Sequence, residues 1–134
     1  MVVIKISTLL ELTIEGLPPT VNQMYRTART GARYKRPEVQ EWQDGVAAVM
    51  RRTWQGKPAY TGDVGVKILF TVNNKKRWDI DNRLKALLDC LQSARVIQDD
   101  SQISGIQAGK TLTADTSSTY IEVHQYEYPT KNKR

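Results

Sequence analysis

Apolar and polar residues alternate in four stretches of the chain, and a period of two is typical of half-buried strands. The first stretch covers residues 2–15, where Ser7–Thr8 would be the place for a break. The second runs from Val64 to Val72, and the others cover residues 102–113 and 118–126. We therefore predict four strands.

Two further segments carry apolar residues at helical spacing. In the first, from Pro37 to Trp54, the proline suits the first turn of an amphipathic helix. In the second, Asp81–Gln92, leucines form one narrow stripe, and Asp81 or Asp79 is a good N-cap. Strands and helices do not alternate regularly and no repeat is present, so we expect one α+β domain over residues 1–134 with two main helices.

Between the first strand and the first helix lies a basic segment without a lasting apolar period. Two prolines in Gly16–Thr20 take the chain out of the sheet. Arginines and lysines then alternate irregularly with Tyr25 and Tyr34, and we expect a mobile basic arm at about residues 23–37. A short basic tail, residues 129–134, ends the chain.

The formal net charge of +6 is unevenly distributed along the chain. Five of the fourteen carboxylates lie between Trp78 and Asp100, which leaves nine acidic residues elsewhere against seventeen of the twenty basic ones. A basic surface attracts polyanions, so the composition suggests nucleic acid as a partner.

The rare residue types exclude several classes of protein. A single cysteine and a single histidine exclude an intrachain disulfide framework and a clustered His/Cys zinc site, and they agree with a reducing compartment. No apolar run approaches the roughly 18 to 20 residues that span a bilayer. We expect a soluble, cytoplasmic protein without a membrane partner.

The acidic residues are spaced so that they can act together. At about 100° per residue, Asp81, Lys85 and Asp89 share one edge of the second helix. Asp79 projects to the same side from an extended entry segment, and Asp99-Asp100 follows the helix by one short loop, so all could converge. Two carboxylates about 4 Å apart repel by about 4 kcal/mol at an effective dielectric of 20. A divalent cation would offset this repulsion, and carboxylate oxygens are ligands typical of Mg²⁺ or Mn²⁺. A metal ion held there could activate water for phosphodiester hydrolysis.

Each acidic residue also has an ordinary structural interpretation. Asp81 alone is a common helix cap, Asp89 is placed to pair with Lys85 at i,i+4, and Asp99-Asp100 suits a surface turn. Cys90 as a nucleophile and His124 as a general base have no evident partner in the sequence, so we assign them structural roles.

The order and spacing of these motifs resemble the RusA family of Holliday junction resolvases. The resemblance rests on D-x-D-N-x-x-K at Asp79–Lys85, on the later Asp99-Asp100, and on Pro18–Asn22 followed by Tyr25-Arg26. It implies a small, typically phage- or prophage-encoded, Mg²⁺-dependent endodeoxyribonuclease, for which Mn²⁺ can substitute. It also implies a mixed sheet with helices in an intertwined homodimer that makes paired symmetric nicks in four-way DNA during recombination and repair.

The same resemblance assigns roles to individual residues. The essential aspartates and metal ligands fall on Asp79, Asp81 and Asp100, and the essential lysine falls on Lys85. We expect DNA contacts from the arm and from the basic turn after the second strand, at Asn22, Arg26, Arg29, Lys75, Lys76 and Arg77. Two alternatives remain open at this point: a non-catalytic nucleic-acid-binding module, and a metal nuclease of broader branched-DNA specificity.

Overall fold

The computed structural model describes residues 7–73, 79–113 and 115–128. Along the chain, the elements are β1 (Thr8–Glu15), α1 (Val21–Met24), β2 (Tyr25–Thr27), β3 (Arg33–Lys35), α2 (Pro37–Trp54), β4 (Val64–Val72), α3 (Asp81–Ser93), the 3₁₀ turn η1 (Asp100–Gln102), β5 (Ile103–Leu112) and β6 (Ser118–Gln125). The four strands and two main helices predicted from the sequence are confirmed, with β1 beginning at Thr8 in the described part of the chain. Within those ranges, no helix is long and apolar enough to cross a bilayer.

The four long strands form one mixed sheet in the order β1-β6-β4-β5. Strand β6 pairs antiparallel with both β1 and β4, whereas β4 and β5 are parallel. A parallel pair needs a crossover connection, and α3 supplies it between β4 and β5. The expected α+β class and mixed sheet are confirmed.

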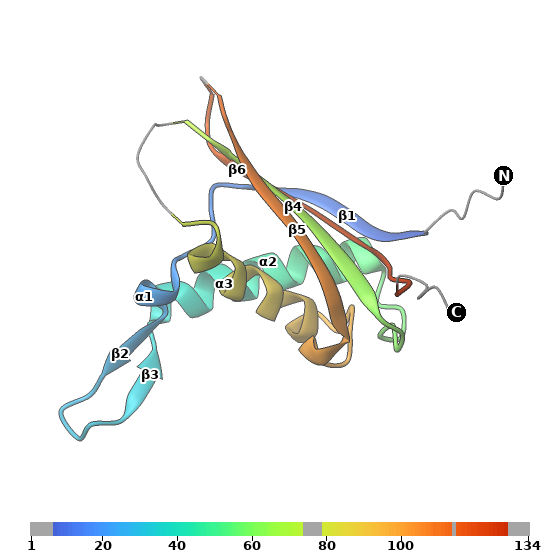
Figure 1. The fold of residues 1–134 in the computed structure, drawn as a ribbon. Coiled ribbons are helices and arrows are strands. Elements are labelled where there is room, and N and C mark those ends of the chain that lie inside the picture. Colours follow the sequence, from blue (N-terminus) through green and yellow to red (C-terminus); the bar gives the residue numbers. More distant parts are fainter. Residues whose placement is uncertain (1–6, 74–78, 114, 129–134) are drawn as a thin grey trace, which may run out of the picture.

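One face of the sheet carries the core, and α2 and α3 cover it (Figure 1). Alternate residues of β4, such as Val66, Ile68 and Phe70, are buried against Met50 of α2 and Leu87 of α3. The intervening positions face the other side, where Leu69 is 42% exposed. The period of two in β4 therefore reflects a sheet that packs helices on one face only.

The segment expected to be a mobile basic arm contains the end of α1 and the hairpin β2-β3, which projects from the body of the molecule (Figure 1). Gly31 has φ +86°, which permits the tight turn, and the Arg33 guanidinium lies 4.6 Å from the centre of the Tyr25 ring. Fully buried Met24 anchors the base of the hairpin. The sequence did not predict this hairpin, because three-residue strands are too short to show a period.

Candidate active site

The carboxylates of the D-x-D motif lie exposed at the N-terminal end of α3. Ile80 precedes the helix with αR geometry, and no side chain caps the first turn. From the residues that the structure describes, Asp79 accepts one long hydrogen bond, 3.5 Å, from the Asn82 side chain. The Asp81 carboxylate has no hydrogen bond or ion pair with any described residue. The interpretation of Asp79 or Asp81 as a helix cap is therefore wrong, and both carboxylates remain available to a ligand.

Lys85 and Asp89 form the ion pair that their i,i+4 spacing predicts. The Lys85 ammonium lies 3.6 Å from the Asp89 carboxylate, and the two side chains are 50% and 29% exposed. Pairs of this kind on a helix surface contribute about 0.3 to 0.5 kcal/mol, so Lys85 can exchange this partner for a phosphate at little cost.

The two neighbouring carboxylates Asp99 and Asp100 have different surroundings. Asp99 caps η1 by accepting hydrogen bonds from the Ser101 amide, at 3.1 Å, and from the Ser101 hydroxyl. These bonds hold the pKa of Asp99 below its ordinary value. The Asp100 amide donates to the Gln92 side chain at 3.1 Å, while its carboxylate has no partner among the described residues. The surface-turn interpretation is confirmed for Asp99, which leaves Asp100 as the free carboxylate.

A single chain does not bring Asp100 to the D-x-D motif. Asp81 begins α3, whereas Gln92, whose side chain holds the Asp100 amide, lies eleven residues further along the same helix, so a rise of about 1.5 Å per residue places Asp81 and Gln92 about 16 Å apart along the helix axis. In the ranges 7–73, 79–113 and 115–128, no three His, Cys, Asp or Glu side chains form a group that could hold a metal ion. The convergence considered from the sequence therefore does not occur within one chain.

The segment after α3 is held at the far end of that helix. Val96 and Ile97 are fully buried, and Ile97 forms a bridge with Tyr60 in the connector after α2. The Gln102 side chain donates to the carbonyls of Tyr60 and Gly62 at 2.7 and 2.9 Å. These long-range contacts stop the loop from returning toward Asp81, and spacing along the sequence gave no sign of them.

The Pro-Pro loop and α1 pack against the N-terminal half of α3. Arg83 donates to the Pro18 carbonyl at 2.6 Å, and Met24 of α1 packs with Ala86 of α3. Asn22 is exposed on α1, the short helix that packs against α3. Arg26 and Arg29 are exposed on the hairpin that continues from α1.

Three of the expected DNA-binding residues, Lys75, Lys76 and Arg77, lie outside the described residues.

Comparison with known proteins identifies the family. The profile described as endodeoxyribonuclease RusA matches residues 15–124, which includes the Pro-Pro loop, the D-x-D-N-x-x-K motif and both later aspartates. This chain belongs to the RusA endodeoxyribonuclease family. It is also 26% identical over 125 residues to a crossover junction endodeoxyribonuclease RusA of Aquifex aeolicus (strain VF5), a match that covers 90% of this chain and 94% of the relative.

Membership of the RusA family confirms the resemblance and the class of activity predicted from the motifs. The chain is a junction-resolving endodeoxyribonuclease, so the alternative of a non-catalytic binding module is set aside. The match runs from the last residue of β1 to His124 near the end of β6, so both main helices and the strands β4, β5 and nearly all of β6 belong to the family domain.

The single cysteine and the single histidine of this RusA-family chain have structural surroundings, as expected. Cys90 is fully buried in the core, and burial, followed by the nearby Asp89 carboxylate, raises the pKa of its thiol to about 12. A thiol that stays protonated is a poor nucleophile. His124 packs over Gly65 on the opposite face of the sheet, with Nδ1 3.8 Å from the Glu122 carboxylate, far from the D-x-D motif.

Proposed function

We propose that this RusA-family endodeoxyribonuclease resolves four-way DNA junctions as a homodimer that uses Mg²⁺ bound by Asp79, Asp81 and Asp100. The observation that supports this proposal is that the five aspartates between residues 79 and 100 differ in their hydrogen-bond and ion-pair partners. Asp89 pairs with Lys85 and Asp99 caps η1, whereas among the described residues the other three carboxylates have at most one weak contact. The free carboxylates are the same three that the family resemblance assigns to the metal.

The donor set fits a hard divalent cation. Asp79 and Asp81 present oxygen ligands two residues apart, on the exposed start of a helix, without a histidine or thiolate nearby in the described structure. Carboxylate oxygens are the ligands that Mg²⁺ and Mn²⁺ prefer, and a cation relieves the repulsion between them. Mn²⁺ should therefore substitute for Mg²⁺.

The separation of about 16 Å along α3 supports a site completed by a second copy of the chain. In a dimer with twofold symmetry, each contact occurs twice with the roles of the two chains exchanged. An arrangement in which the partner subunit's Asp100 lies beside Asp79 and Asp81 would thus form two equal sites. Two sites related by a twofold axis also match the requirement for paired nicks in a four-way junction.

The remaining residues bind and orient the DNA around this site. Asp79, Asp81 and Asp100 would hold the metal ion, which would supply an activated water and positive charge beside the phosphate. Lys85 lies one helical turn from Asp81, where its ammonium can leave Asp89 and donate to a phosphate oxygen. We assign phosphate contacts to Asn22, Arg26 and Arg29, and also to Lys75, Lys76 and Arg77.

The test is cleavage of a synthetic four-way junction with and without Mg²⁺, with the nicks mapped on all four strands. Metal-dependent nicks at symmetric positions on two opposing strands are the expected result. Equal cleavage of linear duplex, fork and junction would instead indicate a metal nuclease of broader specificity. Cleavage that is unaffected by removal of divalent ions would contradict the proposed metal site.

A further inference from the structure

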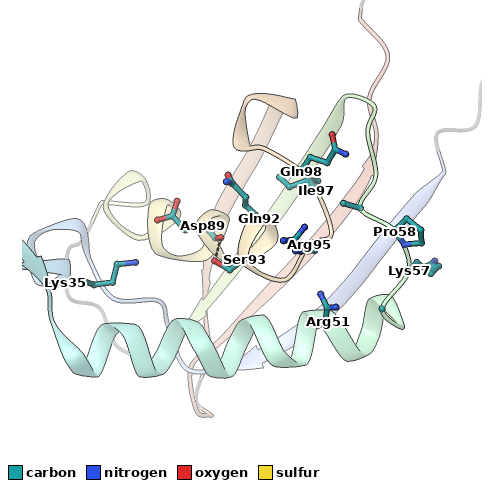
Figure 2. A pocket seen from close by; sticks show the side chains of 12 residues that line it. Lys35, Arg51, Lys57, Pro58, Asp89, Gln92, Ser93, Arg95, Ile97 and Gln98 are labelled. Carbon is teal, nitrogen blue, oxygen red and sulfur yellow. Dashed lines mark hydrogen bonds between the residues drawn. The ribbon is translucent and has the colours of Figure 1, made fainter.

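A polar groove lies between α2, α3 and the connector that follows α2 (Figure 2). Its volume is about 950 Å³, and it opens on the surface of the helical layer. The groove does not include the D-x-D motif, and neither the sequence motifs nor the proposed metal site accounts for it.

The groove carries positive charge that no carboxylate neutralises. Four cationic side chains line it, from four different parts of the chain: Lys35, Arg51, Lys57 and Arg95. Asp89 is the one acidic residue among those that line the groove, and its carboxylate is paired with Lys85. In the described part of the chain, none of the four cations lies within 4.0 Å of a carboxylate oxygen.

Neutral groups hold three of these cations in place. Lys35 donates to the Gln43 side chain at 2.6 Å, and Arg51 donates to the Ala94 carbonyl at 3.4 Å. The Lys57 ammonium lies 4.2 Å from the centre of the Trp54 ring. Such contacts fix the side chains without cancelling their charge, so the groove keeps a positive potential that favours an anion.

The fourth cation, Arg95, occupies a backbone conformation that favours glycine. It follows the C-cap of α3 with φ +57°, and its amide donates to the Gln92 carbonyl at 3.0 Å. Glycine is the usual residue at this position because a Cβ is unfavourable in left-handed geometry. The arginine adds a positive charge both to the negative end of the helix and to the groove that its side chain lines.

We propose that this groove binds the phosphate backbone of one duplex arm of the junction. Lysine and arginine side chains are the usual donors to DNA phosphates, which position the duplex without reading its sequence. The cations extend along α2 from Gln43, which holds Lys35, to Trp54, which holds Lys57. These twelve residues, with eleven steps of about 1.5 Å, span about 16 Å, or about five base pairs at 3.4 Å each.

The groove adjoins the proposed active site at one end. Gln92 lines the groove, and its side chain accepts the hydrogen bond from the Asp100 amide. A duplex arm bound along this groove would therefore pass close to Asp100. The proposed metal site requires a DNA phosphate to approach the Asp100 carboxylate. This inference rests on the proposed function, because it concerns the same DNA substrate.

The experiment compares groove variants with a matched control on the full-length protein. The groove variants are Arg95→Gly and the double variant Arg95→Gly with Arg51→Gln, which remove one and two groove cations. The control is Arg52→Gln, which removes the adjacent arginine of α2. Arg52 is exposed but does not line the groove. Dissociation constants for a four-way junction and for a linear duplex are measured by fluorescence anisotropy without divalent ions, over a range of salt concentrations. Thermal unfolding of each variant checks the fold.

The groove variants should bind both DNAs more weakly by the same factor, roughly three- to tenfold for each cation removed. The slope of log K against log salt should decrease by about 0.9 for each phosphate that the variant no longer binds. Arg52→Gln should bind as the unmodified protein does. Arg95→Gly should unfold at the same or a higher temperature, because glycine suits the left-handed backbone, so weaker binding would not reflect a failure to fold.

Two results would overturn the groove proposal while leaving the proposed function intact. One is unchanged affinity and salt slope in the double variant while junction cleavage by the unmodified protein remains metal-dependent. The other is a double variant that binds DNA normally but sediments as a monomer, which would assign the groove to a protein interface. Failure of the unmodified protein to bind or cut a junction would instead remove the proposed function itself.

Discussion

The two ends of α3 carry the same chemical groups in different surroundings. At the N-terminal end, Asp79 and Asp81 are exposed, and neither caps the helix. At the C-terminal end, Asp99 is fixed by Ser101, and the backbone of Asp100 is held by Gln92. A carboxylate that already has hydrogen-bond donors has a structural reason to be there, whereas a free carboxylate beside others needs a ligand to offset its repulsion. Of the four, only Asp99 has a structural role in the described contacts, and the other three are the carboxylates that we propose as metal ligands.

The N-terminal end of α3 gives the largest expected effect. Asp81→Asn removes one negative oxygen ligand without changing side-chain size, so we expect cleavage of a four-way junction to decrease on the order of a thousandfold or more. Junction binding should persist. Asp89→Asn is the matched control on the same helix edge, and it should keep cleavage within a few-fold because Asp89 only pairs with Lys85. Similar decreases in both variants would contradict the distinction.

The C-terminal end tests the same distinction between adjacent residues. Asp100→Asn should inactivate the enzyme to a similar extent as Asp81→Asn, because the proposed site needs its carboxylate. Asp99→Asn should remain active, since asparagine is an equally good cap for the turn that Ser101 closes. Single-turnover cleavage rates of the two variants measure the difference. Inactivity of Asp99→Asn with activity of Asp100→Asn would reverse the assignment.

Lys85 should give an intermediate effect. Lys85→Gln removes a donor to the phosphate oxygens, and we expect a decrease of about a hundredfold in the cleavage rate with little change in junction binding. Its pair with Asp89 is weak, so the free energy of unfolding should change by less than about 0.5 kcal/mol. Lys85→Arg should restore part of the rate. A full rate for Lys85→Gln would exclude the lysine from the chemistry.

The hairpin beside the N-terminal end of α3 should give the smallest effect. Replacement of Arg26 and Arg29 by glutamine should weaken junction binding several-fold, and the salt slope should decrease by about 0.9 for each arginine that binds a phosphate. The chemical step at saturating DNA should be unchanged. Binding isotherms at several salt concentrations measure this, and an unchanged slope would mean that the hairpin does not contact phosphates.

The long elements were predictable because their apolar patterns are regular. Strand β4 alternates over nine residues and packs its apolar face against two helices, and α2 keeps a helical period over 18 residues. The hairpin β2-β3 was missed, since each of its strands has only three residues. One buried residue directly before the hairpin, Met24, cannot form a repeating apolar pattern. The parallel pairing of β4 and β5 was also missed, because strand order depends on contacts between distant segments.

The residues of the proposed site could be selected from the sequence, whereas their positions in the fold could not. The spacing D-x-D-N-x-x-K identified Asp81 and Lys85 on one edge of α3, and it also predicted the pair of Lys85 with Asp89. The position of Asp100 depends on the burial of Val96 and Ile97 against the connector at the far end of the helix. Such tertiary contacts have no local signal in the sequence, so the separation of the two ends became visible only in the fold.

The central claim is that each active site combines Asp79 and Asp81 of one chain with the partner subunit's Asp100. Mixing two inactive variants, Asp81→Asn and Asp100→Asn, tests it most directly. A heterodimer would contain one site with both substitutions and one site with neither. The proposal therefore predicts that the mixture, after subunit exchange, regains Mg²⁺-dependent nicking of one strand per junction, although neither variant alone is active. A mixture that stays inactive, under conditions where heterodimers are shown to form, would contradict the shared site.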